Sequence, residues 1–412
     1  MSRMLDVYLH NKLAGHLEQS DSGDLTFTYD ADYLILASYG ISLSLPLQAE
    51  SFTGSKVKAF FSGLLPDENQ RDRLAKYLGL SENNAFALLE AVGGDCAGAL
   101  ALYPHGDKPS ADVDAPEVLD DARLKEVLVL IKRRPMLAGD DGYRLSLAGA
   151  HDKLAVGYKN GHVMLIKGGA PTTHILKPII EHVKDSTHNE LFCMKLAHMV
   201  GIDTPQAALH FVGDKPYYLV ERYDRLKDND GKVLRIHQED FCQALGIAPE
   251  IKYEREGGPN IAKCLEVIAL SGARPAADQI KLLNMVLFNY LIGNADAHGK
   301  NFSLLYRDGK PELAPAYDIL STAIYPNLAG KMAMKIGGQY KPEDVYLRHF
   351  HKLGADTKAA QSVMKRQIKT MTKKMLEAAP RLKTSLAEER LVSDVFDDII
   401  AVIKDRAQRL SE

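Results

Sequence analysis

One polar loop, set between an apolar helix and a hairpin, constrains this chain more than any other feature. The loop, residues 294–301, has the sequence NADAHGKN. The apolar residues 282–292 before it predict a buried helix, and strand-forming residues follow it. Beyond a short turn the chain reaches a second carboxylate, Asp318. A loop held at both ends in this way is expected to bring Asp296, Asn301 and Asp318 together.

These three residues have the spacing of a protein-kinase catalytic loop, Asp-x-x-x-x-Asn followed by a second aspartate. In such a loop the first aspartate accepts the proton of the substrate hydroxyl and the asparagine holds one Mg²⁺ ion. The second aspartate holds the metal ions that bridge the phosphates. The alternative is an ordinary turn rich in Asn, Asp and Gly, with local side-chain caps. The turn at Asp308-Gly309 gives the expected hairpin spacing, so we favour a phosphoryl-transfer site with Asp296 as catalytic base.

Composition limits the classes of protein to which the chain can belong. Its 412 residues allow two or three domains. Its formal net charge of -3 requires any direct binding of nucleic acid to come from a local basic patch. The four cysteines lack C-x-x-C spacing, which argues against a disulfide framework or a zinc knuckle. Neither a signal peptide nor a run of about 18 apolar residues is visible, so we expect a cytoplasmic protein with no membrane partner.

Residues 1–105 have the pattern of an α+β subdomain. Alternating apolar and polar residues predict strands at 5–9 and 25–29. Ser81 is a candidate N-cap for a helix beginning at Ala85. A stretch rich in Pro, Gly and Asp then predicts a linker over residues 106–120.

Residues 121–223 have the pattern of a β-rich lobe. The expected strands span residues 144–147, 153–158, 174–177 and 216–223. The Asn160-Gly161 pair predicts a two-residue hairpin turn between apolar runs. One helix interrupts the strands, with a capping box from Thr187 to Glu190 expected at its start and Gly201 at its end.

Residues 224–412 are mostly helical in pattern, apart from the hairpin between Asn301 and Asp318. The order of elements is strands, one helix, a strand, and then helices containing one polar hairpin. That order predicts an α+β, protein-kinase-like two-lobed fold, by analogy with known kinases. It would have a β-rich N-lobe, an all-helical C-lobe and an additional N-terminal α+β subdomain.

Lys177 ends the apolar strand HILK and resembles the V-A-I-K lysine that pairs with the α- and β-phosphates. The alternative is a charged group that reaches solvent from a strand end. The carboxylate partner of this lysine stays open. Glu190 is a candidate but also fits the capping box, and Glu181 is a rival. We assign Lys177 to the catalytic residues.

The turn from Ser146 to Lys153, with the sequence SLAGAHDK, lies between two expected strands. Its backbone N–H groups would lie over phosphates, and Lys153 would add positive charge. Only Gly149 is present of a G-x-G-x-x-G pattern, so an ordinary hairpin loop is the alternative.

His298 allows a metal-ligand interpretation beside Asp296, as in a D-x-H phosphohydrolase. No second histidine lies at metal-ligand spacing nearby in the sequence. A histidine that orients the loop through hydrogen bonds is therefore the favoured interpretation.

A late helix is predicted by apolar residues at helical spacing, namely Met364, Ile368, Met371 and Met375. The other face carries Lys365, Lys369 and Lys373. This face is either solvated or a patch that contacts the phosphates of DNA or tRNA.

Taken together, these residues resemble the HipA-type toxin kinases of bacterial toxin–antitoxin modules. The matching segments, in family order, are LAGAHDK at 147–153, ILK at 175–177, NELFCMKLA at 189–197, VERYDR at 220–225, GNADAHGKNFS at 293–303 and LAPAYD at 313–318. The sequence GLLPDEN at 63–69 looks like part of the family's N-terminal domain, so the resemblance covers nearly the whole chain. His151-Asp152 stands where many relatives have Gln-Glu, which affects loop geometry but not the class.

The resemblance implies a serine/threonine protein kinase that uses ATP and Mg²⁺. Lys177 would hold the phosphates, Asp296 would be the catalytic base, and Asn301 and Asp318 would bind the metal. The other residues implied to contact the nucleotide are Ala148, Gly149, Ala150, His151, Lys153, Val220, Glu221, Tyr223, His298 and Lys300. Ser146 matches the family's autophosphorylated serine, which turns the kinase off by displacing the phosphate loop.

The resemblance also implies partners. A small helix-turn-helix antitoxin, HipB-like, would bind the toxin, and the pair would repress its own operon at operator DNA in the nucleoid. The best-known family substrate is glutamyl-tRNA synthetase, whose phosphorylation would stop translation and cause growth arrest or persistence.

Two other functions compete with an active kinase. One is a catalytically silent kinase fold that acts as a corepressor by holding the antitoxin on DNA. The other is a metal-dependent phosphohydrolase that uses Asp296, His298 and Asp318. Every expected catalytic side chain is present, and a hydrolase would leave Lys177 without a role, so we favour the kinase.

Overall fold

The N-terminal strands pair into an antiparallel sheet of five strands in the order β4-β3-β2-β1-β5. The computed structural model describes residues 3–109, 115–139, 143–328, 330–353 and 358–411. The strands of this sheet are β1 (Arg3–Leu9), β2 (Lys12–Gln19), β3 (Leu25–Tyr29), β4 (Phe52–Thr53) and β5 (Leu100–Pro104). Both strands expected from the alternating pattern, at 5–9 and 25–29, are therefore confirmed.

Four helices accompany this sheet, and their apolar faces share its core. They are α1 (Ala31–Leu36), α2 (Ser55–Gly63), α3 (Glu68–Leu78) and α4 (Ala85–Val92). Phe27 of β3, Phe60 of α2 and Phe86 of α4 are fully buried in the same cluster. The expected Ser81 cap of α4 is wrong. Asn84 directly precedes the helix, and its side chain accepts a hydrogen bond from the N–H of Ala87 at 3.1 Å.

A second antiparallel sheet has the order β10-β11-β9-β7-β8-β6. Its strands are β6 (Glu117–Val118), β7 (Leu154–Lys159), β8 (His162–Leu165), β9 (His174–Pro178), β10 (Ala207–Val212) and β11 (Lys215–Glu221). Asn160 and Gly161 both have positive φ, 53° and 84°, and Lys159 pairs with His162. These angles suit the tight hairpin turn that the sequence predicts, which is thereby confirmed. The helix α5 (Asp121–Arg133) shares the apolar core of this sheet.

Two expectations for this region are corrected. Residues 144–147 form no strand of the sheet; Leu145 makes a single parallel bridge with Asp95, because the neighbouring backbone groups bond to that residue. Glu117 and Val118, expected in the linker, pair with β8. The remaining expected linker residues include 110–114, which lie outside the described residues.

The segment 224–412 contains strands as well as helices. The expected hairpin is present as β15 (Ser303–Arg307) and β16 (Lys310–Leu313). These join β14 (Gln238–Asp240) in a small sheet of order β14-β15-β16. A separate ribbon pairs β12 (Arg225–Lys227) with β13 (Val233–Arg235), and the short helix α7 (Phe241–Leu245) follows β14. The lobe expected to be all helical is thus helical with these strand additions.

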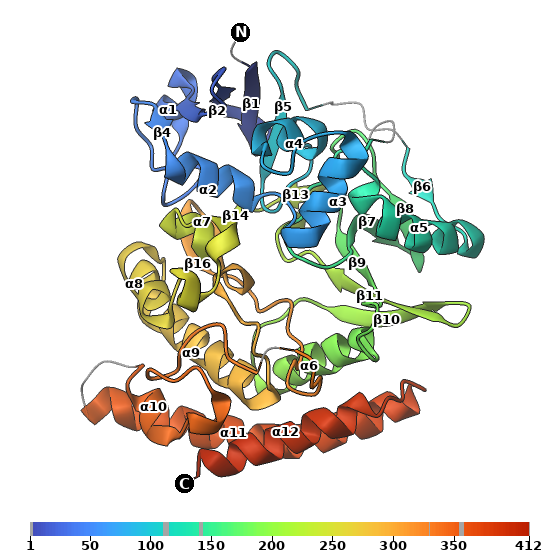
Figure 1. Cartoon of the computed structure of the whole chain (residues 1–412), viewed down its shortest axis with the longest axis vertical. Helices are drawn as coiled ribbons and strands as arrows, with labels where there is room; N and C mark the ends of the chain where they lie inside the picture. Colours follow the sequence, from blue (N-terminus) through green and yellow to red (C-terminus); the bar gives the residue numbers. More distant parts are fainter. Residues whose placement is uncertain (1–2, 110–114, 140–142, 329, 354–357, 412) are drawn as a thin grey trace. The chain divides into compact units, whose positions relative to one another are not determined.

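The chain divides into two compact units (Figure 1). Unit 1 contains residues 1–178, 210–251 and 303–311, and unit 2 contains residues 179–209, 252–302 and 312–412. Unit 1 thus combines both large sheets. Unit 2 is helical, with α6 (Ser186–Val200), α8 (Ile261–Ser271), α9 (Pro275–Ile292), α10 (Leu347–His351), α11 (Lys358–Glu388) and α12 (Val395–Arg409). None of the helices in the described part of the chain combines the length and the apolar character that crossing a bilayer requires.

The helix boundaries of unit 2 follow the sequence in part. Gly201 ends α6 in a left-handed conformation, as expected. The capping box at Thr187 and Glu190 is wrong, because both residues lie inside the helix and Asp185 is its N-cap. The amphipathic helix expected around Met371 is confirmed as α11. Its four apolar residues are buried, whereas Lys365, Lys369 and Lys373 are exposed.

Candidate phosphoryl-transfer site

The residues assigned to a phosphoryl-transfer site from the sequence are distributed over both units. Unit 2 carries Asp296, His298, Lys300, Asn301 and Asp318. Unit 1 carries Lys177 and the segments 146–153 and 220–223. Within each unit, hydrogen bonds and packing contacts hold these residues in place.

The polar loop begins where α9 ends, at Gly293. This glycine has a φ of 81°, and a Cβ atom here would lie 2.6 Å from the Cβ of Ala323, so the position requires glycine. Thr322 then holds the chain. Its Oγ1 accepts a hydrogen bond from the N–H of Ala295 at 2.8 Å and donates one to the carbonyl oxygen of Gly293 at 3.1 Å. The loop therefore leaves the helix in one defined direction.

Asp296 is held by bonds to its side chain and its backbone. The hydroxyl of Tyr253 donates to the Oδ1 atom of Asp296 at 2.7 Å. The N–H of Asp296 donates to the Oδ1 of Asn294 at 3.0 Å, and Asn294 is itself bonded to Asn289 of α9 at 2.9 Å. Asp296 stays partly exposed. The result is an oriented carboxylate that solvent can reach, as a general base requires.

Asn301 and Asp318 lie together, as the hairpin spacing predicts. The Nδ2 of Asn301 donates to the Oδ2 of Asp318 at 3.2 Å, and the Oδ1 of Asn301 accepts from the N–H of His298 at 3.2 Å. Both side chains are partly exposed. Carboxylate and amide oxygens are the protein ligands that Mg²⁺ takes, so the residue types fit a magnesium ion. The Asn301 atom that faces Asp318 is the amide nitrogen, so the amide would have to rotate to direct its oxygen toward an ion held by that carboxylate.

The segment carrying Asp318 is fixed at both ends. The N–H of Ala316 donates to the carbonyl of Asp203 at 2.8 Å. The side chain of Asn189 accepts from the N–H of Ser321 and donates to its carbonyl, both at 2.8 Å. Asp318 itself has a φ of 55°. Positive φ is uncommon for a residue with a side chain and is concentrated at functional sites, although aspartate tolerates it better than most residues.

His298 and Lys300 shape the loop from within. His298 is buried; its Nδ1 accepts from the N–H of Lys300 at 3.3 Å, and its ring packs edge-on against Tyr253. The carbonyl of Lys300 accepts from the hydroxyl of Tyr317 at 2.6 Å. These contacts support the orienting role favoured for His298 over that of a metal ligand.

The loop 146–153 of unit 1 is held by the N-terminal subdomain. Ser146 is fully buried, and its hydroxyl donates to the carbonyl of Leu64 at 2.7 Å. The carbonyl of Gly149 accepts from the N–H of Asp67 at 3.2 Å. Inside the loop, the Nζ of Lys153 donates to the carbonyl of Ala148 at 2.9 Å.

The far end of the same loop contacts α3. Asp152 accepts from the Nε2 of Gln70 at 2.8 Å and forms an ion pair with Arg73 at 2.5 Å. His151 is exposed, and Gly149 has a φ of 117°. The N-terminal subdomain therefore contacts this loop at both of its ends.

Lys177 lies on β9 opposite Tyr218 of β11. Its Nζ is 5.7 Å from the centre of the Tyr218 ring, and the residue is half-buried. Of its two suggested partners, Glu190 is buried and Glu181 is exposed, and the choice between them stays a prediction. Val220 is buried and Glu221 is exposed at the end of β11, while the Tyr223 hydroxyl donates to the side-chain oxygen of Gln238.

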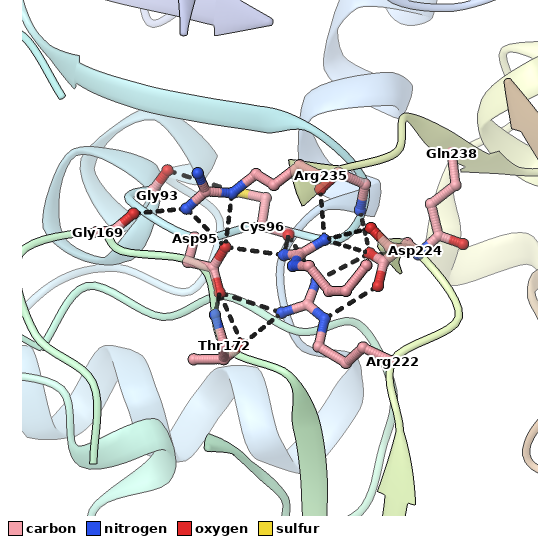
Figure 2. Close-up of polar contacts among 11 residues, drawn as sticks. Gly93, Asp95, Cys96, Gly169, Thr172, Arg222, Asp224, Arg235 and Gln238 are labelled. Atoms are coloured by element: carbon pink, nitrogen blue, oxygen red, sulfur yellow. Dashed lines mark hydrogen bonds and ion pairs between the residues drawn. The ribbon is translucent and has the colours of Figure 1, made fainter. Parts of the chain in front are cut away.

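A buried charge network joins the N-terminal subdomain to the β-rich lobe, as Figure 2 shows. Arg222 forms ion pairs with Asp95 at 3.1 Å and with Asp224 at 2.9 Å. Arg225 does the same, at 2.8 Å to Asp95 and 2.9 Å to Asp224. Arg235 adds a third guanidinium group 3.0 Å from Asp95.

The network keeps both carboxylates ionised. Burial alone would raise the pKa of Asp95, but Arg225, Arg222 and Arg235 outweigh burial and lower that pKa well below its ordinary value. Burial is likewise outweighed at Asp224, where Arg222 and Arg225 lower the pKa of the carboxyl. The Oδ2 of Asp224 also accepts from the N–H of Gly98 at 2.7 Å.

Sequence reasoning missed this network and Tyr253. Arg222, Asp224 and Arg225 follow a buried strand within the matching segment VERYDR, and buried charges require partners. That density of charge was the available signal, although nothing nearby in the sequence pointed to Asp95. Tyr253 carried no comparable signal.

Comparisons with known proteins identify the family of this chain. The family model of the HipA-like C-terminal domain matches residues 145–381, and that of the HipA N-terminal domain matches residues 5–103. This chain belongs to the HipA family. It is 42% identical over 385 residues to Y4mE of Sinorhizobium fredii, and the match covers 92% of each chain. Y4mE is named as a kinase. The chain is 31% identical over 354 residues to the serine/threonine-protein kinase toxin HipA of Shewanella oneidensis, with 80% of each covered.

Comparison with a solved structure shows that the chain has the fold of HipA. The chain matches the complex of HipA, HipB and operator DNA from Shewanella oneidensis with a TM-score of 0.82 and 28% identity. The match covers 99% of this chain and 97% of that chain. The kinase-like α+β fold expected from the sequence is thereby confirmed.

Proposed function

We propose that this HipA-family protein is a serine/threonine protein kinase that transfers the γ-phosphate of ATP to a protein hydroxyl. The observation that carries the proposal is the joint geometry of Asp296, Asn301 and Asp318 in unit 2. One carboxylate is oriented and accessible, while a carboxamide and a second carboxylate lie within 3.2 Å of each other. Phosphoryl transfer depends mainly on positioning and on neutralising charge, and these residues can do both.

Each residue has a role in this proposal. Asp296, held by Tyr253, accepts the proton of the substrate hydroxyl. Asn301 and Asp318 hold Mg²⁺, which supplies the charge that neutralises the nucleotide phosphates. Lys177 binds the phosphates, and the loop 148–153 lies over them. The segment Val220–Tyr223 contacts the adenine.

The partners follow from the family. We infer that a HipB-like helix-turn-helix antitoxin binds this chain and that the complex represses its own operon at operator DNA. The structural relative is itself a complex with HipB and operator DNA, which supports this inference. The substrate class is an aminoacyl-tRNA synthetase, such as glutamyl-tRNA synthetase, whose phosphorylation stops translation. Phosphorylation of Ser146 turns the enzyme off.

One observation favours the silent corepressor as a second candidate. The lysines of α11, Lys365, Lys369 and Lys373, are exposed on one helix and give a local positive surface that could contact DNA phosphates. Their effect is separable from catalysis, because none of them belongs to the polar loop.

The deciding experiment is a phosphotransfer assay with labelled ATP and Mg²⁺. We expect the wild type to label Ser146 or a protein substrate and Asp296→Asn to lose labelling while still binding ATP. Asp308→Asn is the matched control; Asp308 is exposed at the hairpin turn, and asparagine tolerates its φ of 49°. Failure of the wild type to bind ATP at millimolar concentration would exclude a kinase. Growth arrest that survives Asp296→Asn would favour the corepressor.

A further inference from the structure

Three neighbouring strands bring two imidazoles and one carboxylate to the same place on the N-terminal sheet. Asp6 lies on β1, which pairs with β2 on one side, and it is directly opposite His16 of β2. On the other side β1 pairs with β5, and His105 immediately follows that strand. The Nδ1 atoms of His16 and His105 each lie 2.8 Å from the Oδ1 of Asp6.

The carboxylate of this cluster is held in place. Asp6 is 4% exposed, and its Oδ2 accepts from the N–H of Gly106 at 2.9 Å. Only Oδ1 therefore faces the two histidines. A carboxylate fixed through one oxygen, with the other directed at two imidazole nitrogens, is arranged as a monodentate ligand with an outer hydrogen-bond partner.

We propose that Asp6, His16 and His105 form a binding site for Zn²⁺, separate from the magnesium site of the proposed kinase. Two imidazoles and one carboxylate are a ligand set typical of open zinc sites, in which water completes the tetrahedron. The hard cations Mg²⁺ and Ca²⁺ take oxygen ligands and so would not compete for two nitrogen donors. Within the described residues, this is the single group of three His, Cys, Asp or Glu side chains whose ligand atoms lie within 4.8 Å of one another.

The geometry needs only small adjustments to accept the ion. With metal–ligand distances of about 2.0–2.1 Å, ligand atoms around a tetrahedral zinc ion lie roughly 3.3 Å apart. The Asp6–His distances would lengthen by about half an ångström, and the imidazoles would turn toward each other. The His105 side chain is 60% exposed, which leaves it room to turn. When the metal binds, the Nδ1 atom of each imidazole coordinates it through a lone pair. Each neutral imidazole then carries its proton on Nε2.

The ion would link three strands. Because β1 lies between β2 and β5 in the sheet, a metal bound to all three ligands ties the start of the chain to the end of β5. The site uses no residue of the proposed kinase machinery, so it stands whether or not that function is correct.

Cobalt(II) absorption tests the proposal, since tetrahedral Co²⁺ absorbs strongly in the visible range. The tag-free full chain is titrated with Co²⁺ in excess Mg²⁺, which saturates oxygen-only sites. All four cysteines are buried, so thiolates of the folded protein do not contribute. We expect one Co²⁺ per chain, displaced by one equivalent of Zn²⁺.

Two variants and a control make the result specific. We expect His105→Gln and Asp6→Asn to weaken Co²⁺ and Zn²⁺ binding by about tenfold or more, because each removes one of three ligands. His162→Gln is the matched control, since His162 is exposed at the β7–β8 turn. His105→Gln changes an exposed side chain, so its fold, checked by circular dichroism, should be intact. Binding that is absent in the wild type, or unchanged in His105→Gln, would show that the histidines only donate hydrogen bonds to Asp6.

Discussion

The hydroxyl of Ser146 donates a hydrogen bond to the carbonyl oxygen of Leu64, 2.7 Å away, and the serine is fully buried. This contact links the loop proposed to cover the phosphates to the N-terminal subdomain. A phosphoryl group on Ser146 would add about two negative charges and could not be accommodated in this position. The loop must therefore leave its site when the serine is phosphorylated.

The first prediction concerns that displacement. Phosphorylation of Ser146 should speed hydrogen exchange at the Ser146 amide, whose N–H donates to the carbonyl of Asp95 at 3.1 Å. It should also weaken ATP binding. Exchange mass spectrometry and nucleotide titration of phosphorylated and unphosphorylated samples test both effects. Ser146→Ala, treated with ATP in the same way, is the control. Equal exchange and equal ATP affinity in the two wild-type samples would contradict the switch.

The second prediction concerns the other end of the loop. Arg73→Ala removes the ion pair with Asp152 and should raise the KM for ATP by about tenfold, equivalent to roughly 1.4 kcal/mol, because the loop loses a contact that positions it. Lys76→Ala is the matched control. It removes a positive charge from the same helix, but its pair with Asp72 is on the surface and does not touch the loop, so the KM for ATP should stay unchanged. Equal KM values for the two variants would show that Asp152 does not position the loop.

The third prediction concerns the buried charge network of Figure 2. Asp95→Asn leaves three guanidinium groups with one carboxylate and should reduce the free energy of unfolding by about 3–5 kcal/mol in urea titrations. Glu126→Gln, which breaks a surface pair with Arg123, should change it by less than about 0.5 kcal/mol. A stability loss for Asp95→Asn no greater than that of the control would mean that the network is not required for folding.

The same network makes the free energy of unfolding depend on pH in the acid range. The pKa values of Asp95 and Asp224 are lowered in the folded state, so their contribution is complete above the ordinary value near 3.8. It is lost as the pH falls through the lower folded values, because protonation then favours the unfolded chain. The stability difference between wild type and Asp95→Asn should therefore shrink below about pH 4.

The sequence predicted the local elements better than the contacts between distant segments. The Asn160-Gly161 turn and the end of the helix at Gly293 depend on positive φ values, which asparagine and glycine adopt readily. The identity of these residues in the sequence therefore predicts both features. The association of Asn301 with Asp318 was also predictable, because one hairpin joins them. Asp95 was missed because the arginines that pair with it lie more than a hundred positions away.

Two local patterns led to wrong predictions. The strand expected at 144–147 has the right alternation, but Arg144 and Ser146 bond through their backbones to Asp95 in the N-terminal subdomain. The residues Thr187 and Glu190 have the types and spacing of a capping box, but the N-cap is Asp185, two residues earlier, and the helix begins at Ser186. A contact between distant segments decided the first case, and a local pattern does not contain it.

The last prediction concerns a buried carboxyl in unit 1. Glu239 is 1% exposed; it accepts hydrogen bonds from Ser42 at 2.5 Å, from the N–H of Leu43 at 3.0 Å, and from the hydroxyl of Tyr306. Burial raises its pKa to about 7, from an ordinary value near 4.5. The folded state therefore binds this proton more tightly than the unfolded state does. The resulting stability is complete below about pH 4.5 and is lost as the pH rises toward 7.

Glu239→Gln should remove this dependence, because an amide does not titrate in this range. Between pH 7 and 4.5 the wild type should gain about 3 kcal/mol of unfolding free energy relative to the variant, at roughly 1.4 kcal/mol per pH unit. Nearby His237 has a pKa lowered by burial to about 3, which favours the unfolded state as the pH drops below 6.5. That opposing effect is common to both proteins and cancels in the difference. Urea unfolding of both proteins at pH 5, 6 and 7 measures the difference, and a value independent of pH would show that Glu239 is already ionised in the folded chain.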